Sequence, residues 1–286
     1  MARKSLRTLL QSDQVIVAPG VYDAWSAKLV EDAGFQAVYM SGMAVTGSLL
    51  GAPDLGLLTM TEMVGRASAI AKAVKIPVIA DADNGYGGPL NVMRTVQEYE
   101  AGGVAAIHIE DQVIPKRCGY YPGKVLVEPN EMVDRIRAAL EARQSDEFFI
   151  IARSDAIAVE GIEEAIKRGQ LYKETGADAL FFEAIESIDQ IRSIREAVPG
   201  VLMINMVEGS KTPLLKINQL GEMGYKIVIF SGSLLRVASF AMKKYLENLK
   251  TKGSTEEFLP SMMTPNERNR LSRLDEYFEL SAKFGG

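Results

Sequence analysis

The sequence predicts an α/β protein, a (β/α)8 or TIM barrel followed by a C-terminal helical extension. Short segments rich in β-branched residues alternate with stretches of helical periodicity, which is the pattern of parallel βα units. Eight such segments occur, and 286 residues suffice for one large α/β domain. An open doubly wound sheet is the alternative, but its Gly-rich phosphate-binding sequence does not follow the first segment. A closed barrel is therefore favoured.

The expected strands are short apolar runs, and the expected helices carry apolar residues at three- and four-residue spacing. In chain order the strands are residues 15–18, 37–40, 77–80, 105–109, 148–152, 179–182, 201–204 and 226–230. The helices between them include residues 61–74, 90–101, 129–143, 162–175 and 188–197. Several of these helices run into an Ala-Gly or Thr-Gly step, which is typical of a helix C-terminus.

The chain continues well beyond the eighth strand, with further helices predicted over residues 234–249 and 265–282. We assign residues 1–240 to a catalytic barrel and residues 241–286 to a helical extension of the same domain. The extension either packs on its own subunit or docks on a neighbouring copy, and the pattern alone does not separate the two.

Composition and charge exclude several classes of protein. With 47% apolar and 24% charged residues, the chain is neither disordered nor collagen-like. No apolar run approaches the roughly 18 residues that span a bilayer, and no signal-peptide core is recognisable, so we expect no membrane partner and a cytoplasmic location. A net charge of −5 without long blocks of one sign disfavours nucleic acid. The single cysteine, Cys118, excludes an intrachain disulfide and indicates a reducing compartment.

Acidic residues follow two neighbouring strands. In a parallel barrel the chemistry gathers at the carboxyl ends of the strands. Asp81 and Asp83 come after the third strand, and Glu110 ends the fourth. Because close carboxylates need a counter-charge, we predict a divalent cation here; Mg²⁺ prefers such oxygen ligands, and Mn²⁺ would suit the same set. The structural alternative is that Asp81 and Asp83 only cap the next helix; the presence of Glu110 favours the metal.

A basic segment, residues 115–124, contains the only cysteine. Lys116 and Arg117 precede Cys118 directly and are expected to favour its thiolate form, giving a thiol that exchanges protons near neutral pH. We interpret the segment as a lid that closes over substrate. The alternative is a solvated basic loop in which the cysteine is incidental.

Two more strand residues are candidates for the site. His108 lies two positions before Glu110 and therefore on the same face of the strand. It could be a base or a ligand, but we expect a hydrogen-bonded barrel residue that supports the metal carboxylates. Arg153 ends the fifth strand, where a guanidinium can clamp a substrate carboxylate. A buried ion pair between Arg153 and a neighbouring acid is the competing interpretation.

Taken in order, eight motifs resemble the isocitrate lyase and phosphoenolpyruvate mutase superfamily, and most closely its 2-methylisocitrate lyase and dimethylmalate lyase branch. They extend over nearly the whole chain and comprise residues 39–42, 53–56, 81–87, 108–112, 116–119, 151–156, 182–184 and 205–208. The resemblance implies a barrel whose last helix is exchanged between paired subunits, in a dimer of dimers and thus a homotetramer.

The resemblance also implies roles for the matching residues in binding a small-molecule carboxylate substrate. Asp81, Asp83 and Glu110 would form the metal shell, partly through water, with Asp54 as a supporting acid. Ser41, Gly42 and Met43 would hold the 2-oxo acid portion of the substrate. The remaining pocket and gating-loop residues would be Arg153, Glu183, Asn205, Lys116, Arg117, Cys118 and Gly119. Enzymes of this kind stabilise an enolate oxyanion with Mg²⁺ and oriented donors.

The loop sequence Lys116–Gly119 resembles that of the lyases, in which the cysteine is the general acid toward the carbanion-like product. The phosphonate mutases and hydrolases and the oxaloacetate decarboxylase-like members generally lack this cysteine. Two residues depart from the lyase pattern: Tyr120 stands where histidine is usual, and Asn84 stands where threonine is usual.

The sequence thus predicts a Mg²⁺-dependent carbon–carbon lyase that cleaves a 2-hydroxy di- or tricarboxylate to a 2-oxo acid such as pyruvate and a second carboxylic acid. Cys118 would protonate the departing carbanion, and Tyr39 and Glu183 are the candidates for the base. The alternatives are an oxaloacetate decarboxylase or a phosphonopyruvate hydrolase or mutase on the same site, and a catalytically inactive metal-binding scaffold.

Overall fold

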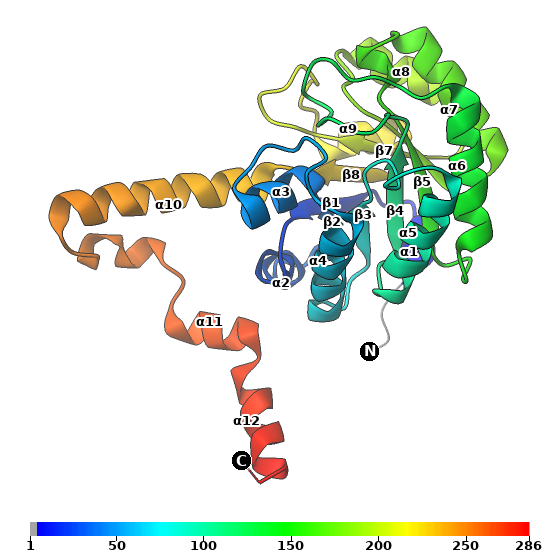
Figure 1. Ribbon diagram of the computed structural model, residues 1–286. Helices are drawn as coiled ribbons and strands as arrows, with labels where there is room; N and C mark the ends of the chain where they lie inside the picture. The colour runs from blue at the N-terminus through cyan, green and yellow to red at the C-terminus, as the bar shows by residue number, and fades with distance from the viewer. Residues whose placement is uncertain (1–4, 286) are drawn as a thin grey trace. The chain divides into compact units, whose positions relative to one another are not determined.

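A computed structural model describes residues 5–285 and contains a closed barrel of parallel strands (Figure 1). The strands are β1 (Ile16–Val21), β2 (Val38–Met40), β3 (Val78–Asp81), β4 (Ala106–Glu110), β5 (Phe149–Ser154), β6 (Ala179–Phe182), β7 (Val201–Asn205) and β8 (Ile227–Phe230). Each pairs with the next, and β8 pairs with β1, with Ile16 opposite Ile227. The predicted TIM barrel is confirmed.

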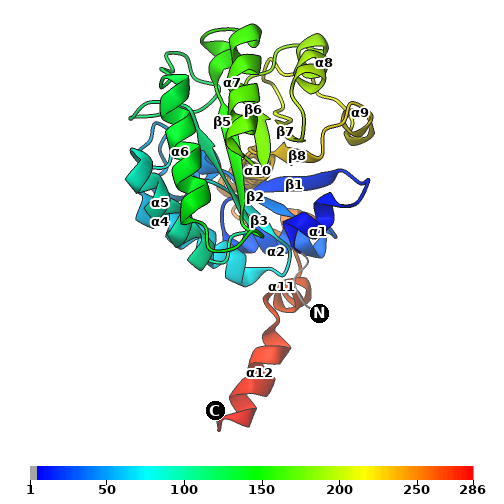
Figure 2. The same cartoon turned by 90° about the vertical axis from the view of Figure 1, so that its right-hand side faces the viewer.

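Helices surround the strands, as Figures 1 and 2 show. Those of the barrel are α1 (Leu6–Leu10), α2 (Ala24–Asp32), α3 (Gly42–Leu50), α4 (Met60–Ala73), α5 (Pro89–Ala101), α6 (Pro129–Ala142), α7 (Ile162–Thr175), α8 (Ile188–Ala197) and α9 (Ile217–Glu222), with a short 3₁₀ turn at Ala156–Ala158. The helices predicted between strands all occur. Helices α1, α2, α3 and α9 were not among those named; α3 begins directly after Ser41 at the end of β2.

Two apolar clusters stabilise the barrel. Side chains on the outer face of the strands pack under the helices, whereas inward-pointing residues such as Ile79 and Ile151 form an inner cluster. Leu6 and Leu9 of α1 belong to this inner cluster and are buried. Burial of a leucine side chain contributes about 1.5–3 kcal/mol, so α1 is a firm part of the barrel.

The chain divides into two compact units, residues 1–234 and 235–286. The second unit carries most of α10 (Ser233–Lys252), a 3₁₀ segment (Glu256–Ser261), α11 (Pro265–Ser272) and α12 (Leu274–Lys283). The prediction of one helix over residues 265–282 is wrong, because Arg273 adopts a left-handed conformation (φ 61°) that separates α11 from α12. The expected boundary after residue 240 falls within α10 and stays a prediction.

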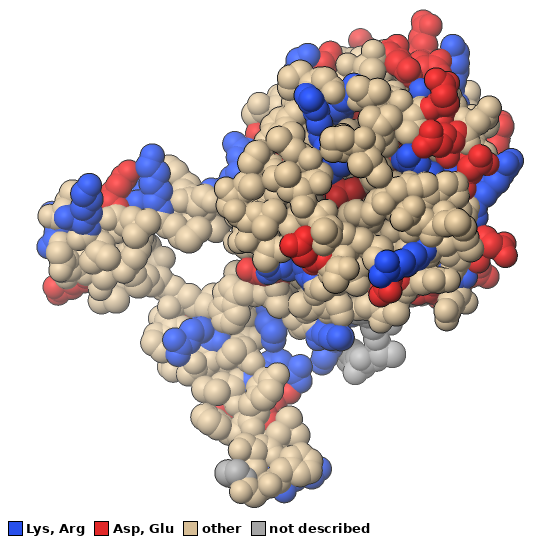
Figure 3. Space-filling view, viewed as in Figure 1, with Lys and Arg blue, Asp and Glu red and all other residues tan. Residues whose placement is uncertain are grey.

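Acidic and basic side chains are interspersed over the face of the barrel seen in Figure 3. Among the described residues, no helix combines the length and the apolar character that crossing a bilayer requires.

Candidate active site

The predicted acids lie together at the carboxyl ends of β3 and β4. Asp81 ends β3 and is held from two sides: its Oδ2 accepts a hydrogen bond from the Gly42 backbone (3.1 Å) and its Oδ1 accepts one from the Asp83 backbone (3.0 Å). A Cβ added at Gly42 would come within 2.5 Å of this carboxylate, so only glycine permits the approach. Asp83 has a left-handed backbone (φ 48°), a strained conformation of the kind found at functional sites.

The structure does not support the interpretation of Asp81 and Asp83 as helix caps. Helix α5 begins after Gly88 and has no side-chain cap. Both aspartates are instead buried, with only 4% and 5% of their surface exposed. They therefore belong to the interior of the site.

Glu110 is fully buried at the end of β4, and neither of its carboxylate oxygens accepts a hydrogen bond from the described residues. Burial raises its pKa well above the usual range, and burial likewise raises the pKa of Asp83 to about 6. Burial outweighs the neighbouring Lys116 and Arg153 cations, so ionising these carboxylates is costly in the site as it stands. A divalent cation would lower this cost, so the donor set fits Mg²⁺ or Mn²⁺.

The acidic side chains alone do not form a complete set of ligands around one metal position. Within residues 5–285, no three His, Cys, Asp or Glu side chains converge closely enough to enclose a metal ion. A shell completed by water and substrate oxygens is the arrangement that Mg²⁺ commonly takes, and it does not require such a cage.

Lys116 brings its own positive charge to the acids. Its Nζ lies 2.5 Å from Asp83 Oδ1 and 2.7 Å from Asp54 Oδ1, and the side chain is buried. Burial opposes a charged lysine, yet Asp83 and Glu110 raise its pKa well above the usual range. Lys116 is therefore a permanent cation that ties the loop to Asp54 and Asp83.

The loop around Cys118 is fastened by further hydrogen bonds. The Cys118 backbone donates to the Asp54 carbonyl (3.2 Å), and the Gln112 amide both donates to and accepts from the Arg117 backbone (2.9 Å each). Asn84, one of the two departures from the lyase pattern, donates to the carbonyl of Val113 at the start of this loop (3.2 Å). The interpretation as an incidental solvated loop does not fit these contacts.

The expectation of a Cys118 thiolate is wrong. Burial raises the pKa of the thiol to about 11, and this outweighs the neighbouring cations. The Lys116 ammonium is already committed to Asp54 and Asp83, while the exposed Arg117 guanidinium donates to the carbonyl of Pro122 (2.9 Å). Cys118 thus carries its proton at neutral pH, as a proton donor requires.

Gly119 packs against the centre of the site. A Cβ at this position would lie 2.4 Å from Glu183 Cγ and 2.8 Å from Arg153 Nη2. The loop backbone therefore touches the floor of the site, with no room for a side chain.

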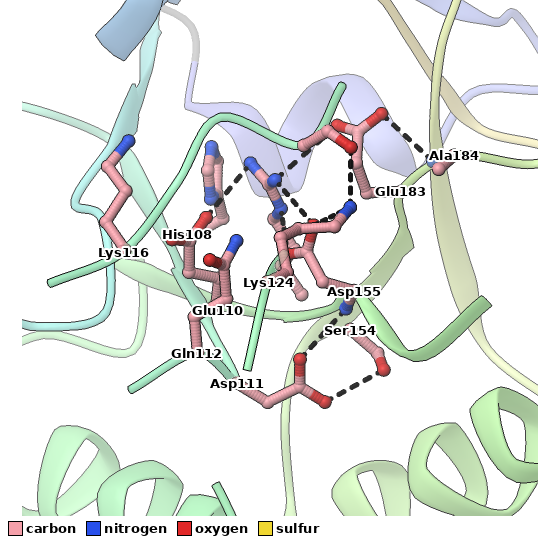
Figure 4. A network of polar contacts seen from close by, with 12 residues as sticks. His108, Glu110, Asp111, Gln112, Lys116, Lys124, Ser154, Asp155, Glu183 and Ala184 are labelled. Carbon is pink, nitrogen blue, oxygen red and sulfur yellow. Dashed lines mark hydrogen bonds and ion pairs between the residues drawn. The ribbon is translucent and has the colours of Figure 1, made fainter. Parts of the chain in front are cut away.

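Arg153, at the end of β5, forms the buried ion pairs that we considered as an alternative. It holds Asp155 with two hydrogen bonds (2.9 and 3.0 Å), and its Nη1 lies 3.2 Å from Glu110 Oε2. Its Nη2 lies 3.8 Å from Glu183 Oε2. Arg153 is thus oriented by three acids, Glu110, Asp155 and Glu183. Figure 4 labels these three acids.

Tyr39 and His108 occupy the barrel below the acids. The Tyr39 hydroxyl is hydrogen-bonded to His108 Nε2 (2.8 Å), which lies 3.6 Å from Asp81 Oδ1. Burial raises the pKa of Tyr39 well above its usual range and lowers that of His108 to about 4. His108 is thus a neutral barrel residue that is hydrogen-bonded to Tyr39 and, among the described residues, makes no hydrogen bond to Asp81.

The remaining substrate-binding candidates lie at the same edge, with one exception. Ser41 caps α3 by accepting from the Ala44 backbone (3.3 Å), and Met43 lies in the first turn of that helix. Asn205, at the end of β7, donates to the Tyr120 hydroxyl (3.3 Å). The Arg117 side chain is the exception, since its contact is within the loop.

Sequence reasoning assigned no role to two charged residues of this site, Lys124 and Asp155. Lys124 is buried and contacts Asp155 (3.1 Å), and the Asp155 backbone donates to Asp111 Oδ1 (2.9 Å). Both residues stood within motifs that we singled out, the basic loop and the end of β5. The contacts of Lys124 with Asp155 and of Asp155 with Asp111 join positions 31 and 44 apart, which no local pattern indicates.

The fold and the site together define a TIM-barrel enzyme with buried acids beneath a cysteine-bearing loop. The phosphoenolpyruvate phosphomutase family matches residues 6–250. The chain therefore belongs to this family and to the PEP mutase/isocitrate lyase superfamily.

Two relatives are similar over nearly the whole chain. The 2,3-dimethylmalate lyase of Eubacterium barkeri is 47% identical over 98% of this chain and 96% of its own length. The 2-methylisocitrate lyase of Aeropyrum pernix is 44% identical over 97% of this chain and 89% of its own length. These relatives are carbon–carbon lyases, in agreement with the predicted class of enzyme.

Solved structures show the same similarity. A 2,3-dimethylmalate lyase superposes with a TM-score of 0.91 at 42% identity, covering 98% of this chain and 94% of that one. Oxaloacetate acetylhydrolase with 3,3-difluorooxalacetate gives 0.92 at 37% identity (99% and 97%). Phosphonopyruvate hydrolase in complex with oxalate and Mg²⁺ gives 0.90 at 31% identity (100% of both chains).

Proposed function

We propose that this chain is a carbon–carbon lyase that cleaves a 2-hydroxy di- or tricarboxylate, of the dimethylmalate or 2-methylisocitrate type, into a 2-oxo acid and a second carboxylic acid. The observation that carries the proposal is the position and state of Cys118. It is the only cysteine, burial raises the pKa of its thiol to about 11, and its loop is fastened to the acids of the site through Lys116.

The reaction needs a base at the substrate hydroxyl and an acid at the departing carbon. The base takes the hydroxyl proton, the carbon–carbon bond breaks, and its electron pair goes to the departing carbon, to which Cys118 gives its proton. Of the two candidates for the base, Tyr39 is disfavoured because burial raises its pKa, so we assign the role to Glu183. Arg153 and Asn205 would orient the substrate carboxylates.

Asp81, Asp83 and Glu110 would hold a divalent cation, Mg²⁺ or Mn²⁺. When bound, the cation supplies positive charge to the oxyanion that develops on the 2-oxo acid. The support for this ligand set is that Asp81, Asp83 and Glu110 are buried at the ends of neighbouring strands, and that both Glu110 oxygens lack a hydrogen-bond donor among the described residues.

The test is product identification. The purified protein with MgCl₂ is incubated separately with 2,3-dimethylmalate, 2-methylisocitrate, isocitrate, oxaloacetate and phosphonopyruvate, and the products are assigned by NMR. We expect a 2-oxo acid and a second organic acid in equal amounts from one of the first three substrates, with no turnover after chelation.

Other outcomes would favour the alternatives. Carbon dioxide or phosphate released without a second organic acid would indicate a decarboxylase or a phosphonopyruvate enzyme on the same site. Binding of Mg²⁺ and oxalate without turnover of any substrate would indicate an inactive scaffold.

We also propose that the chain forms a helix-swapped dimer and, from two such dimers, a homotetramer. An apolar groove of about 390 Å³ lies beside β1 and β8, lined by residues that include Leu29, Phe35 and Ile217. In a closed barrel this position between α2 and α9 takes the eighth helix. On α10, Val237 and Phe240 are three positions apart and more than half exposed, so one face of this helix is apolar and uncovered.

Light scattering after size exclusion tests the assembly. We expect the mass of a tetramer for the wild type and a smaller assembly for Phe240→Asp. A wild-type monomer would contradict the proposal.

A further inference from the structure

Lys124 closes the cysteine loop. Only 2% of its side chain is exposed, and its Nζ donates to the Gly119 carbonyl (2.5 Å) and to Asp155 Oδ1 (3.1 Å). Figure 4 shows Lys124 reaching Asp155 at the floor of the site. One ammonium group thus joins the loop backbone, at the residue next to Cys118, to a carboxylate on the barrel.

Asp155 is a fixed acceptor for this lysine. It is fully buried, its backbone is bonded to Asp111, and its carboxylate is bidentate to Arg153. Although burial opposes its charge, Arg153 and Lys124 lower the pKa of Asp155 to about 2. The acceptor therefore stays anionic over the physiological range.

Lys124 holds the loop at Gly119, the residue at which the loop packs against the barrel. The Gly119 backbone packs against Glu183 and Arg153 without room for a Cβ, so a small movement of the Gly119 peptide separates the two surfaces. Two other fastenings, through Lys116 and through Gln112, lie before Cys118 in the chain. Lys124 fastens the segment after Cys118. The other contacts of that segment are longer or stay within the loop: Asn205 donates to the Tyr120 hydroxyl (3.3 Å), and Arg117 donates to the Pro122 carbonyl (2.9 Å).

We propose that Lys124 is a positioning residue, which keeps Cys118 in place by linking the Gly119 carbonyl to Asp155. We call these three groups, the Lys124 ammonium, the Gly119 carbonyl and the Asp155 carboxylate, the loop anchor. Lys124 acts through the loop backbone and does not itself touch the reacting atoms. The loop anchor does not depend on which reaction the site carries out.

The single cysteine makes the loop anchor measurable. The second-order rate of Cys118 alkylation by iodoacetamide reports how often the loop opens, because no other thiol is present. We expect Lys124→Met, which keeps the alkyl chain and removes the ammonium, to raise this rate about tenfold or more, equivalent to about 1.4 kcal/mol in loop-opening free energy. The alkylation rate is measured over a series of pH values. Greater access to Cys118 raises the rate equally at every pH, whereas a changed pKa of the thiol shifts the pH at which the rate levels off.

Two further variants complete the comparison. Lys124→Arg can still donate to both partners and is expected to stay within about threefold of the wild-type rate. Lys173→Met is the matched control, because Lys173 also donates to a backbone carbonyl (Ala177, 3.0 Å) but at the far end of α7. It should alkylate at the wild-type rate.

Lys124→Met is expected to fold, because Asp155 keeps its bidentate pair with Arg153. If it does not, Lys124→Gln retains a donor for the carbonyl and tests the same point. Alkylation of the folded variant within twofold of wild type, or an equal rise in Lys173→Met, would overturn the proposal. Because alkylation needs no substrate, this result is independent of the lyase test; an active wild type should also lose turnover in Lys124→Met.

Discussion

The Tyr39 hydroxyl and His108 Nε2 lie 2.8 Å apart inside the barrel, and His108 is fully buried. The hydrogen bond orients the imidazole toward Asp81, and burial keeps it neutral. A neutral histidine in such a position makes stability depend on pH, because protonation would place an extra charge in the core.

Acid should therefore destabilise the metal-free protein through His108. Its pKa falls from 6.5 to about 4 on folding, so its contribution is fully present above pH 6.5 and is lost as the pH falls through 4. We expect wild type to lose up to about 3 kcal/mol of unfolding free energy from this group. Urea unfolding of wild type and His108→Gln, with chelator present, measures it; identical pH slopes for the two proteins would contradict the assignment.

Cys118→Ser should depress cleavage far more than metal affinity. Serine keeps the shape of the side chain but is a much weaker acid, so turnover should fall about 100-fold or more while the Mg²⁺ dissociation constant changes less than about threefold. Kinetics and calorimetric titration give the two quantities. Equal turnover in the variant would remove Cys118 from the mechanism.

The state of the thiol can be measured directly in the wild type. Because the pKa of Cys118 is raised to about 11, alkylation should be slow at neutral pH and should rise tenfold per pH unit until the pH nears 11. A plateau already reached at neutral pH would show a thiolate and contradict the role of proton donor.

Asp83→Ala should abolish metal-dependent turnover and the thermal stabilisation by Mg²⁺. Lys116 keeps Asp54 as its partner, so the loop should remain folded. Asp134→Ala is the matched control, since that aspartate lies on α6 with 62% of its side chain exposed. Thermal melts with and without MgCl₂ compare the two variants, and an unchanged response of Asp83→Ala would exclude Asp83 as a ligand.

Gly119→Ala should prevent the loop from seating. The added Cβ would meet Glu183 at 2.4 Å, so we expect turnover to fall about 100-fold with little change in unfolding free energy. Gly65→Ala in α4, where a Cβ meets nothing within 4 Å, is the control and should be fully active. Activity retained by Gly119→Ala would mean that the loop does not close as described.

The strands could be predicted from the sequence because their hydrophobic pattern depends only on residues that are neighbours in the chain. Residues 179–182 were predicted as a strand and form β6 with the same limits, and the acids after β3 and β4 followed directly from the strand ends. Helix α3 escaped because Gly42 and Gly47 interrupt its periodicity. The split at Arg273 escaped because a left-handed arginine has no sequence signal.

The electrostatics of the site could not be predicted in the same way. The Lys116 pairs with Asp54 and Asp83 join positions far apart in sequence, and these pairs withdraw the charge that was expected to ionise Cys118. The pKa of Cys118 and the buried position of Lys124 both depend on the folded loop. Lysine or arginine residues next to a cysteine in the sequence therefore do not predict the pKa of its thiol, because those cations can be paired with acids elsewhere in the fold.

Helix α1 covers the end of the barrel at which the strands begin, with Leu6 and Leu9 buried in the inner cluster. Within residues 5–285, the apolar side chains of the inner cluster fill the barrel below the charged groups of the site. Substrate and products would then enter and leave at the opposite end of the barrel, at the carboxyl ends of the strands, where the Cys118 loop lies. Exchange of substrate and products at that end would require the Cys118 loop to move, a kind of step that limits turnover in many enzymes.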